Sequence, residues 1–201
     1  MSTTTIATPA APTTAPQEVD NRSAYVAFGL AYVLGHGGAA LSHGADPVLS
    51  LPGWLPTAFL ATGLAAGSVL STVAAVRAKK GLGKPESTTA SLLGAIWVTG
   101  FAALFLLITA LADLTGSADL QSVLWPTGSA LVVGLIYLAE GSARRNALHY
   151  ALGTWLALVA GAAIFLGGSG LFGVLAVAGG GAYLVAAVLE RRRLVGAGAP
   201  A

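Results

Sequence analysis

The stretch WLPTAFLATGLAAGSVLSTVAAV, residues 54–76, contains no charged residue, and the basic cluster RAKK follows it directly at residues 77–80. A helix needs roughly 20 mostly apolar residues to cross the hydrocarbon core of a bilayer. The stretch is too long for a strand, and polar and apolar residues do not alternate along it. Because backbone groups in lipid must bond within their own segment, the stretch predicts a transmembrane helix that ends at a basic membrane face.

The rest of the chain has the same character. Of its 201 residues, 55% are hydrophobic and only 9% are charged, whereas soluble domains usually carry about 25% charged residues. We therefore predict an all-α, polytopic integral membrane protein. Its six predicted transmembrane helices cover about 24–43, 54–76, 88–112, 122–140, 148–167 and 170–189.

The basic residues give this layout an orientation. All ten Lys and Arg residues fall on one side of the predicted membrane: Arg22, Arg77, Lys79, Lys80, Lys84, Arg144, Arg145, Arg191, Arg192 and Arg193. The connections on the other side contain Asp46, Asp113 and Asp119 but no basic residue. Since Lys and Arg accumulate in cytoplasmic loops, we predict a multi-pass protein of the cytoplasmic membrane with both termini inside the cell.

Two terminal segments differ from the six-helix bundle predicted for residues 23–190. Residues 1–22 are rich in Thr, Ala and Pro and have no long apolar run. Such a segment buries too little surface to offset its ordering entropy, so it is predicted to be a disordered cytoplasmic tail. It also lacks the basic start and apolar core of a signal peptide. Residues 191–201 are predicted to form a basic cytoplasmic C-terminal tail.

Two histidines near the outer end of the first predicted helix form a candidate site. His36 and His43 are seven residues apart, which places them on one helix face about 10 Å apart along the axis. With Asp46, Asp113 or Asp119 they could form an external proton or ligand site, because histidine titrates near neutral pH. Alternatively, each imidazole is structural and bonds to a neighbouring backbone carbonyl. One zinc ion cannot bridge imidazoles this far apart, so no metal is predicted there.

Other cofactors and catalytic sites are not predicted. The chain has no cysteine, which excludes disulfides and thiolate ligands. A bis-histidine haem would need His149 near His36, but His149 opens the fifth helix on the cytoplasmic side. Glu140 and Arg144 are four residues apart and are predicted to form a helical ion pair at the inner surface. No catalytic motif is present, so the chain is not expected to be an enzyme, and its short basic clusters do not predict nucleic-acid binding.

Three stretches carry a resemblance to a known group: PGWLPTAFLATGL (52–64), LQSVLWPTGSALVVGLIYLAEG (120–141) and RRNALHYALGTWLAL (144–158). Together with the layout of the helices, they resemble small six-span actinobacterial integral membrane proteins that are often labelled ABC transporter permease. The resemblance covers roughly residues 23–193 and contains no catalytic motif, so it implies no functional residue.

Two functions are therefore expected. The first is a transport-related, permease-like membrane subunit without its own ATPase, which works with a separate ATPase or another membrane subunit. The second is a non-transporting scaffold or sensor that uses His36 and His43 near the outer face. In both cases the lipid bilayer is the main partner, and small residues spaced four apart in several helices would also allow a homo-oligomer.

Overall fold

A computed structural model describes residues 18–44, 46–79, 82–117 and 119–197 of the chain. All regular secondary structure in these residues is helical, as predicted. The predictions for residues 1–17 and 198–201 lie outside the described residues. The elements are α1 (Arg22–Ala31), η1 (Tyr32–His36), α2 (Gly37–Ser42), α3 (Trp54–Lys79), α4 (Lys84–Thr115), α5 (Asp119–Ala143), α6 (Ala147–Ala163), α7 (Gly168–Val174), η2 (Leu175–Gly180) and α8 (Gly181–Ala197).

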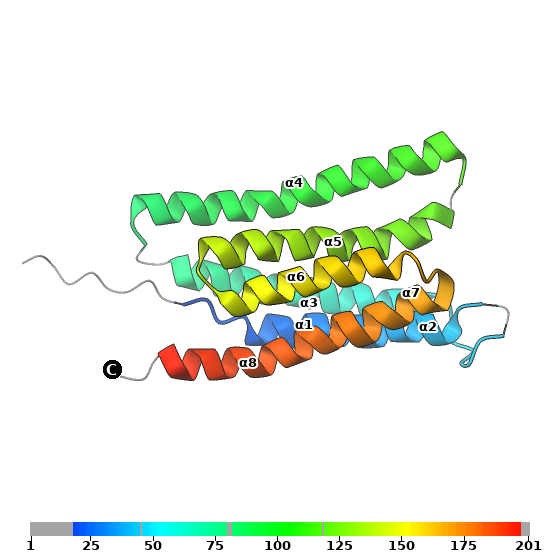
Figure 1. Cartoon of the computed structure of the whole chain (residues 1–201), viewed down its shortest axis with the longest axis horizontal. Helices are drawn as coiled ribbons and strands as arrows, with labels where there is room; N and C mark the ends of the chain where they lie inside the picture. Colours follow the sequence, from blue (N-terminus) through cyan, green and yellow to red (C-terminus); the bar gives the residue numbers. More distant parts are fainter. Residues whose placement is uncertain (1–17, 45, 80–81, 118, 198–201) are drawn as a thin grey trace, which may run out of the picture.

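The helices form an elongated antiparallel bundle (Figure 1). α1, η1 and α2 form one continuous rod, as do α7, η2 and α8. The start of α1, the α3–α4 and α5–α6 connections and the end of α8 all lie at one end of the bundle, and the other connections lie at the opposite end. We call the first end the basic end, because the described Lys and Arg residues belong to its connections and helix termini.

Five of the helical rods are long and apolar enough to cross a membrane. The remaining long helix, α6, has 17 residues and is about 26 Å long, slightly less than the hydrocarbon core of about 30 Å. Large apolar side chains are exposed along α3 and α4, among them Val69, Val98 and Leu106. Soluble monomers rarely expose so much apolar surface, and lipid would cover it.

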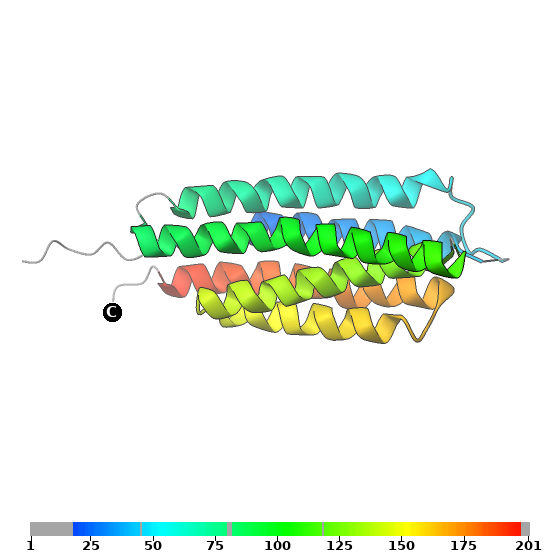
Figure 2. The same ribbon diagram turned by 90° about the horizontal axis from the view of Figure 1, so that it is seen from above.

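Glycines decide which helices approach each other most closely. At Gly153 of α6, an added Cβ would lie 2.6 Å from the carbonyl oxygen of Gly134 in α5, so the two backbones are in direct contact. At Gly63 of α3, an added Cβ would lie 2.5 Å from the Cβ of Ala31 at the end of α1. These glycines therefore serve packing within one chain. α4 packs chiefly on α5 and lies at the edge of the bundle in Figure 1, so in the view from above it is drawn in front of the other helices (Figure 2).

The two π-helical segments face each other in the middle of the first and last rods. η1 contacts η2, and the Tyr32 ring lies against Gly179 and Gly180, where added Cβ atoms would be 2.9 and 3.1 Å from Tyr32 atoms. A π-helical turn inserts an extra residue into a helix and is frequent at functional sites. Here it coincides with the position of Tyr32 and His36 in the interior.

The start of the bundle agrees with the predicted end of the N-terminal tail to within one residue, and part of the predicted C-terminal tail is helical. α1 begins at Arg22, and α8 continues through Arg191–Arg193 to Ala197, so the described part of the predicted C-terminal tail is largely helical. The extension of α8 has a local cause, because Arg193 bonds to Glu190 one turn earlier in the same helix. The three arginines therefore lie in the last part of α8.

Candidate functional site

A buried carboxylate and a buried imidazole meet at the basic end of the bundle. Glu140 lies near the end of α5 and His149 in the first turn of α6, and the short α5–α6 connection brings them together. The Trp97 indole of α4 donates a hydrogen bond to Glu140 Oε1 at 2.9 Å. Glu140 Oε2 lies 3.3 Å from His149 Nε2. Three helices thus contribute to one polar cluster, which we call the inner site.

His149 is bonded through its ring Nδ1 and its backbone N–H, but not through Nε2 in the described part of the chain. Its Nδ1 is 2.5 Å from the Tyr25 hydroxyl of α1, and its backbone N–H donates to Asn146 Oδ1, which caps α6. His149 is only 4% exposed. Its Nε2 has no hydrogen-bond partner among the described residues, because the 3.3 Å contact with Glu140 is not aligned as a hydrogen bond. A buried polar atom without a partner needs an explanation, and a bound ligand or water is one.

Glu140 and His149 line a cavity of about 560 Å³ at the basic end. Together with Asn21, these two side chains are among its least exposed polar groups. Its exposed charged residues are the cations Lys79, Arg144 and Arg145 and the carboxylates Glu18 and Glu86. We call Glu140 and His149 the floor of the cavity and the three cations its mouth. The volume is within the usual range for small-molecule sites, about 300–1,000 Å³.

The mouth contains a strained residue. Arg145 has φ 53°, a left-handed backbone conformation that is unusual for a non-glycine residue. The N–H of Arg145 donates to the Ser142 carbonyl and the N–H of Asn146 to the Gly141 carbonyl, which is the Schellman arrangement at the end of a helix. Glycine is the usual residue at this position of the motif. An arginine there places a guanidinium at the mouth at a cost in backbone energy.

An ion pair with one fully buried partner, Glu190, also borders the inner cavity, which Arg193 lines. Glu190 of α8 is fully buried, and it accepts hydrogen bonds from Arg193 at 2.8 and 2.9 Å and from the backbone N–H of Asn21 at 3.3 Å. Arg193 also pairs with Glu18 and donates to the Val19 carbonyl. This cluster ties the segment before α1 to α8.

The ion pair between Arg22 and Asp20 differs from the Glu190–Arg193 pair because both of its side chains are exposed to solvent. Arg22 and Asp20 are 2.6 Å apart, and both side chains are nearly half exposed. The hydrogen bond from Arg22 lowers the pKa of the Asp20 carboxyl, although partial burial acts in the opposite direction. Exposed pairs of this kind typically contribute less than about 1 kcal/mol.

The predicted ion pair between Glu140 and Arg144 is wrong. No contact within ion-pair distance joins their side chains in the described chain, and only the Arg144 N–H bonds to the Glu140 carbonyl. The carboxylate instead points into the bundle, because Trp97 donates to it there. Arg144, at the end of the helix, lies exposed at the mouth of the cavity.

The structure brings together the two predicted outer histidines but not the aspartates. The rings of His36 and His43 both lie beside Phe172 of α7, with centroid distances of 6.1 and 5.6 Å. His43 is the first residue after α2 and has an extended backbone, so Phe172 is their common neighbour but the two histidines do not lie on one helix. His36 is buried, and its Nδ1 has no hydrogen-bond partner among the described residues, whereas His43 is exposed.

The three candidate aspartates, Asp46, Asp113 and Asp119, are exposed. The α4–α5 connection between Asp113 and Asp119 lies at the opposite edge of the bundle from the end of α2 (Figure 1). Within the described ranges, no group of three His, Asp or Glu side chains could hold a metal ion. The outer site therefore consists of the two histidines alone.

A column of aromatic rings connects the inner site to the outer histidines. Each ring contacts the next, and the centroids of neighbouring rings are between 4.9 and 6.3 Å from each other. In order from the basic end, the column consists of His149, Tyr25, Tyr183, Tyr32, His36, Phe172 and His43. The column fills the interior between the first and last rods and carries hydroxyl and imidazole groups along most of its length.

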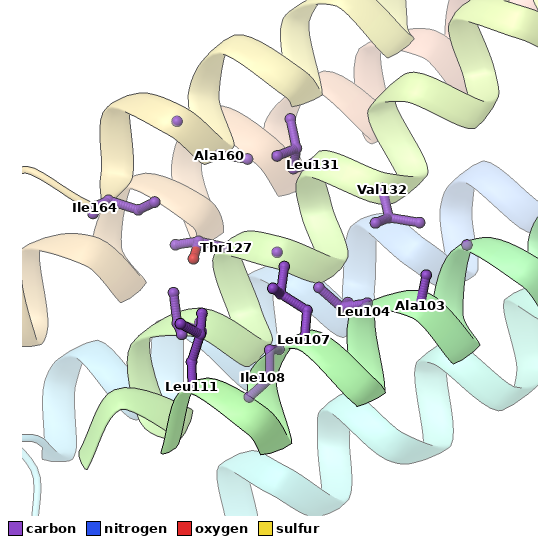
Figure 3. Close-up of a pocket in the computed structure, with 14 residues that line it drawn as sticks. Ala103, Leu104, Leu107, Ile108, Leu111, Thr127, Leu131, Val132, Ala160 and Ile164 are labelled. Atoms are coloured by element: carbon purple, nitrogen blue, oxygen red, sulfur yellow. The ribbon is translucent and has the colours of Figure 1, made fainter. Parts of the chain in front are cut away.

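A second cavity, of about 420 Å³, lies between α4, α5 and α6 (Figure 3). Leu104, Leu107, Leu131 and Ile164 point into it, and its walls are almost entirely apolar. The Thr127 hydroxyl, the polar group closest to it in Figure 3, is already bonded to the Val123 carbonyl at 2.7 Å. This cavity offers hydrophobic contact but no group that could orient a polar ligand.

The hydrogen bond between Tyr25 and His149 can be tested by substitution. Tyr25→Phe would remove the partner of the buried Nδ1 and leave both imidazole nitrogens without hydrogen bonds. We expect the free energy of unfolding to fall by about 1–3 kcal/mol, measured by unfolding in mixed detergent micelles. Tyr150→Phe is the control, because Tyr150 is exposed, and it should change stability by less than about 0.5 kcal/mol. Equal effects of the two substitutions would contradict the role of this bond.

In comparisons with known proteins, the chain matches no protein-family model, no curated protein and no solved structure. The resemblance to permease-like membrane proteins therefore stays a prediction. Function has to be inferred from the inner site, the cavity and the aromatic column.

Proposed function

We propose that the chain is a six-span protein of the cytoplasmic membrane, with both termini in the cytoplasm, that acts as a transport-related membrane subunit. The inner site would be its cytoplasmic-facing binding site for a small polar solute. The observation that carries this proposal is the cavity with a buried carboxylate and an imperfectly satisfied imidazole at its floor. Ionisable groups at membrane depth are costly and usually mark solute or ion pathways.

The surroundings of the inner site also favour a solute over a purely structural role. A structural ion pair is stabilised by aligned hydrogen bonds on all buried atoms, whereas His149 Nε2 has none among the described residues. Trp97 is hydrogen-bonded to the Glu140 carboxylate and Tyr25 to the His149 imidazole. Hydrogen bonds of this kind fix the orientation of side chains that bind a ligand. Since the described chain contains no nucleotide-binding fold, energy for transport would come from a separate protein.

Co-purification tests this function. The protein would be tagged at its C-terminus, extracted from native membranes in mild detergent and analysed by mass spectrometry. A stoichiometric ATPase partner would support a transport subunit, and it should be lost when both Arg144 and Arg145, at the basic loop, are changed to Gln. A protein that purifies alone would contradict the need for an energy-supplying partner.

A separate observation favours the second function, a non-transporting sensor or scaffold. The aromatic column fills the interior, and His36 is enclosed while His43 is exposed at the far end. A filled interior with an exposed titratable group at one end suits a sensor of external conditions. A solitary protein whose cellular phenotype depends on external pH, and loses that dependence in His43→Ala, would establish this alternative.

The proposed topology makes a direct prediction. The chain has no native cysteine, so single cysteines can be labelled without background. Gly53→Cys, in the exposed connection before α3, should react with a membrane-impermeant maleimide in intact cells. Ala143→Cys, in the wall of the cavity, should react only after permeabilisation. Labelling of both cysteines from outside, or of Ala143→Cys alone, would contradict the six-span, both-termini-inside arrangement.

A further inference from the structure

The charges around the inner cavity differ between its buried and exposed parts, and the exposed part has more cations than carboxylates: Glu86 lines it as well, and Glu18 is paired with Arg193. The floor contains the Glu140 carboxylate, whose side chain is 15% exposed, and the mouth contains the exposed Lys79, Arg144 and Arg145. We propose that the cavity binds a small amphoteric amine, with a primary ammonium group at Glu140 and a phosphate or carboxylate group at the mouth. This inference rests on the proposed function, because it names the chemical class of the solute for the same site.

The floor is suited to a primary ammonium group. Trp97 occupies Glu140 Oε1, while Oε2 has no hydrogen-bond donor among the described residues and lies 3.3 Å from His149 Nε2. In the tautomer in which His149 Nδ1–H donates to the Tyr25 oxygen, Nε2 is an acceptor. Two acceptors 3.3 Å apart can both accept hydrogen bonds from one ammonium group, which has three donors.

No lysine or arginine of the described residues already occupies this position. In the described ranges, neither Lys nor Arg lies within ion-pair distance of Glu140, and its close charged or polar neighbours are His149 and Trp97. With His149 in its neutral tautomer, the Glu140 carboxylate has no counter-charge within ion-pair distance in the described chain, which is unfavourable for a buried group. The ammonium group of a ligand would provide the missing charge, which explains why the site would bind an amine rather than a neutral solute.

The mouth is suited to an anionic group. Arg193, which also lines the cavity, is committed to Glu190 and Glu18. By contrast, Lys79, Arg144 and Arg145 form no ion pair with any carboxylate of the described residues. Guanidinium groups bind phosphate and carboxylate through paired hydrogen bonds. The strained backbone of Arg145 is explained if its side chain is needed there.

Two sources can supply this chemistry. One is a free solute that carries both an ammonium and an anionic group. The other is the headgroup of a phospholipid with an ethanolamine group in the cytoplasmic leaflet, since the cavity lies at the ends of the helices. The chemical class is the same in both cases, and the experiment separates the two sources.

The test is a calorimetric titration of the purified, full-length protein in detergent with O-phosphoethanolamine. Ethanolamine and inorganic phosphate, which each carry one of the two charges, are the comparison probes. We expect O-phosphoethanolamine to bind at least about tenfold more tightly than either of them, because each charge-assisted contact contributes separately. The same titration in nanodiscs with and without phosphatidylethanolamine separates the sources. Weaker binding in discs that contain this lipid would show that its headgroup occupies the site.

Paired variants locate the binding. Glu140→Gln keeps the shape of the floor and removes its charge, and should weaken binding about tenfold or more. Asp119→Asn, an exposed carboxylate at the other end, is its control and should have no effect. Arg144→Gln with Arg145→Gln should also weaken binding. Arg191→Gln with Arg192→Gln, exposed at the same end but outside the cavity wall, should not.

Four results would overturn the inference. If inorganic phosphate binds as tightly as O-phosphoethanolamine and Glu140→Gln has no effect, the cavity is a simple anion site. If ethanolamine binds equally and the arginine variants have no effect, it is a simple cation site. If no probe binds although Ala90→Cys, in the cavity wall, reacts with thiol reagents from inside, the solute is of another class and the proposed function stands. If no probe binds and Ala90→Cys is unreactive, the proposed function fails as well.

Discussion

Replacing Gly153 with alanine should destabilise the bundle more than any other single methyl group added to α6. An alanine Cβ at this position would lie 2.6 Å from the Gly134 carbonyl oxygen and 2.7 Å from the Leu138 backbone nitrogen. Both are backbone atoms of α5, so no side-chain rotation can relieve the overlap, and the helices must move apart. We expect the free energy of unfolding to fall by about 3 kcal/mol or more, at the upper end of the range for overpacking.

The same helix provides a matched control. Gly161 lies eight residues further along α6, and an added Cβ there would meet no atom within 4 Å. Gly161→Ala should leave stability unchanged or raise it by up to about 1 kcal/mol, because alanine has the higher helix propensity. Both variants would be unfolded reversibly in mixed micelles. Similar losses in the two variants would show that α5 and α6 do not approach as closely as described.

Gly153 also controls the inner site. The close approach of α5 and α6 places Glu140 beside His149, so separating the helices should disturb the cavity as well. Gly153→Leu, which is larger, is expected to abolish both the folded bundle and any binding at the inner site. Stability and binding should therefore be lost together at Gly153, whereas Glu140→Gln should affect binding far more than folding.

The helices could be predicted from the sequence because each is a long apolar run between turns. Five predicted spans correspond to rods long and apolar enough to cross a membrane, within a few residues at most ends. Errors concentrate where side-chain contacts extend a helix, as when Arg193 bonds back to Glu190. The π-helical segments could not be predicted, because a single inserted residue leaves the apolar pattern intact.

The candidate site could be predicted only in part. His36 and His43 are seven residues apart and both rings lie beside Phe172, but α2 ends at Ser42, before His43, which the spacing does not reveal. The sequence identifies Glu140 and His149 separately, but whether their side chains meet depends on how tightly the α5–α6 connection turns. Two features accompany this tight turn: Asn146, which caps α6 three positions before His149, and the neighbouring Arg145, which has a glycine-like backbone conformation. The aromatic column joins residues from distant helices, and no sequence spacing reveals it.

Glu190→Gln should produce the second large effect, because it removes the charge of a fully buried residue. Glu190 is 0% exposed and is bonded to Arg193 and to the N–H of Asn21. Removing one partner of a buried ion pair typically costs about 3–5 kcal/mol, since the other charge is left without compensation. Arg193 keeps Glu18 as a partner, so we expect a loss of about 3 kcal/mol in the free energy of unfolding.

The exposed pair at the same end is the control. Asp20→Asn breaks an ion pair of similar length, but both of its side chains face solvent, so the expected loss is less than about 1 kcal/mol. Hydrogen exchange should distinguish the two variants locally. The amide of Asn21 should exchange faster in Glu190→Gln, because its acceptor is weakened, and not in Asp20→Asn. Equal exchange rates in the two variants would contradict this role for Glu190.

The double variant Glu190→Gln with Arg193→Gln tests whether the instability of Glu190→Gln comes from the unpaired charge of Arg193 or from the loss of the ion pair itself. If the single variant is unstable mainly because Arg193 loses its buried partner, removing that charge should restore part of the stability. The double variant should then be more stable than the sum of the two single losses implies. Strict additivity would mean that the two side chains act independently. In that case the segment before α1 would be held to α8 by Glu18 and the backbone alone, and the inner cavity would lose a fixed wall at Asn21.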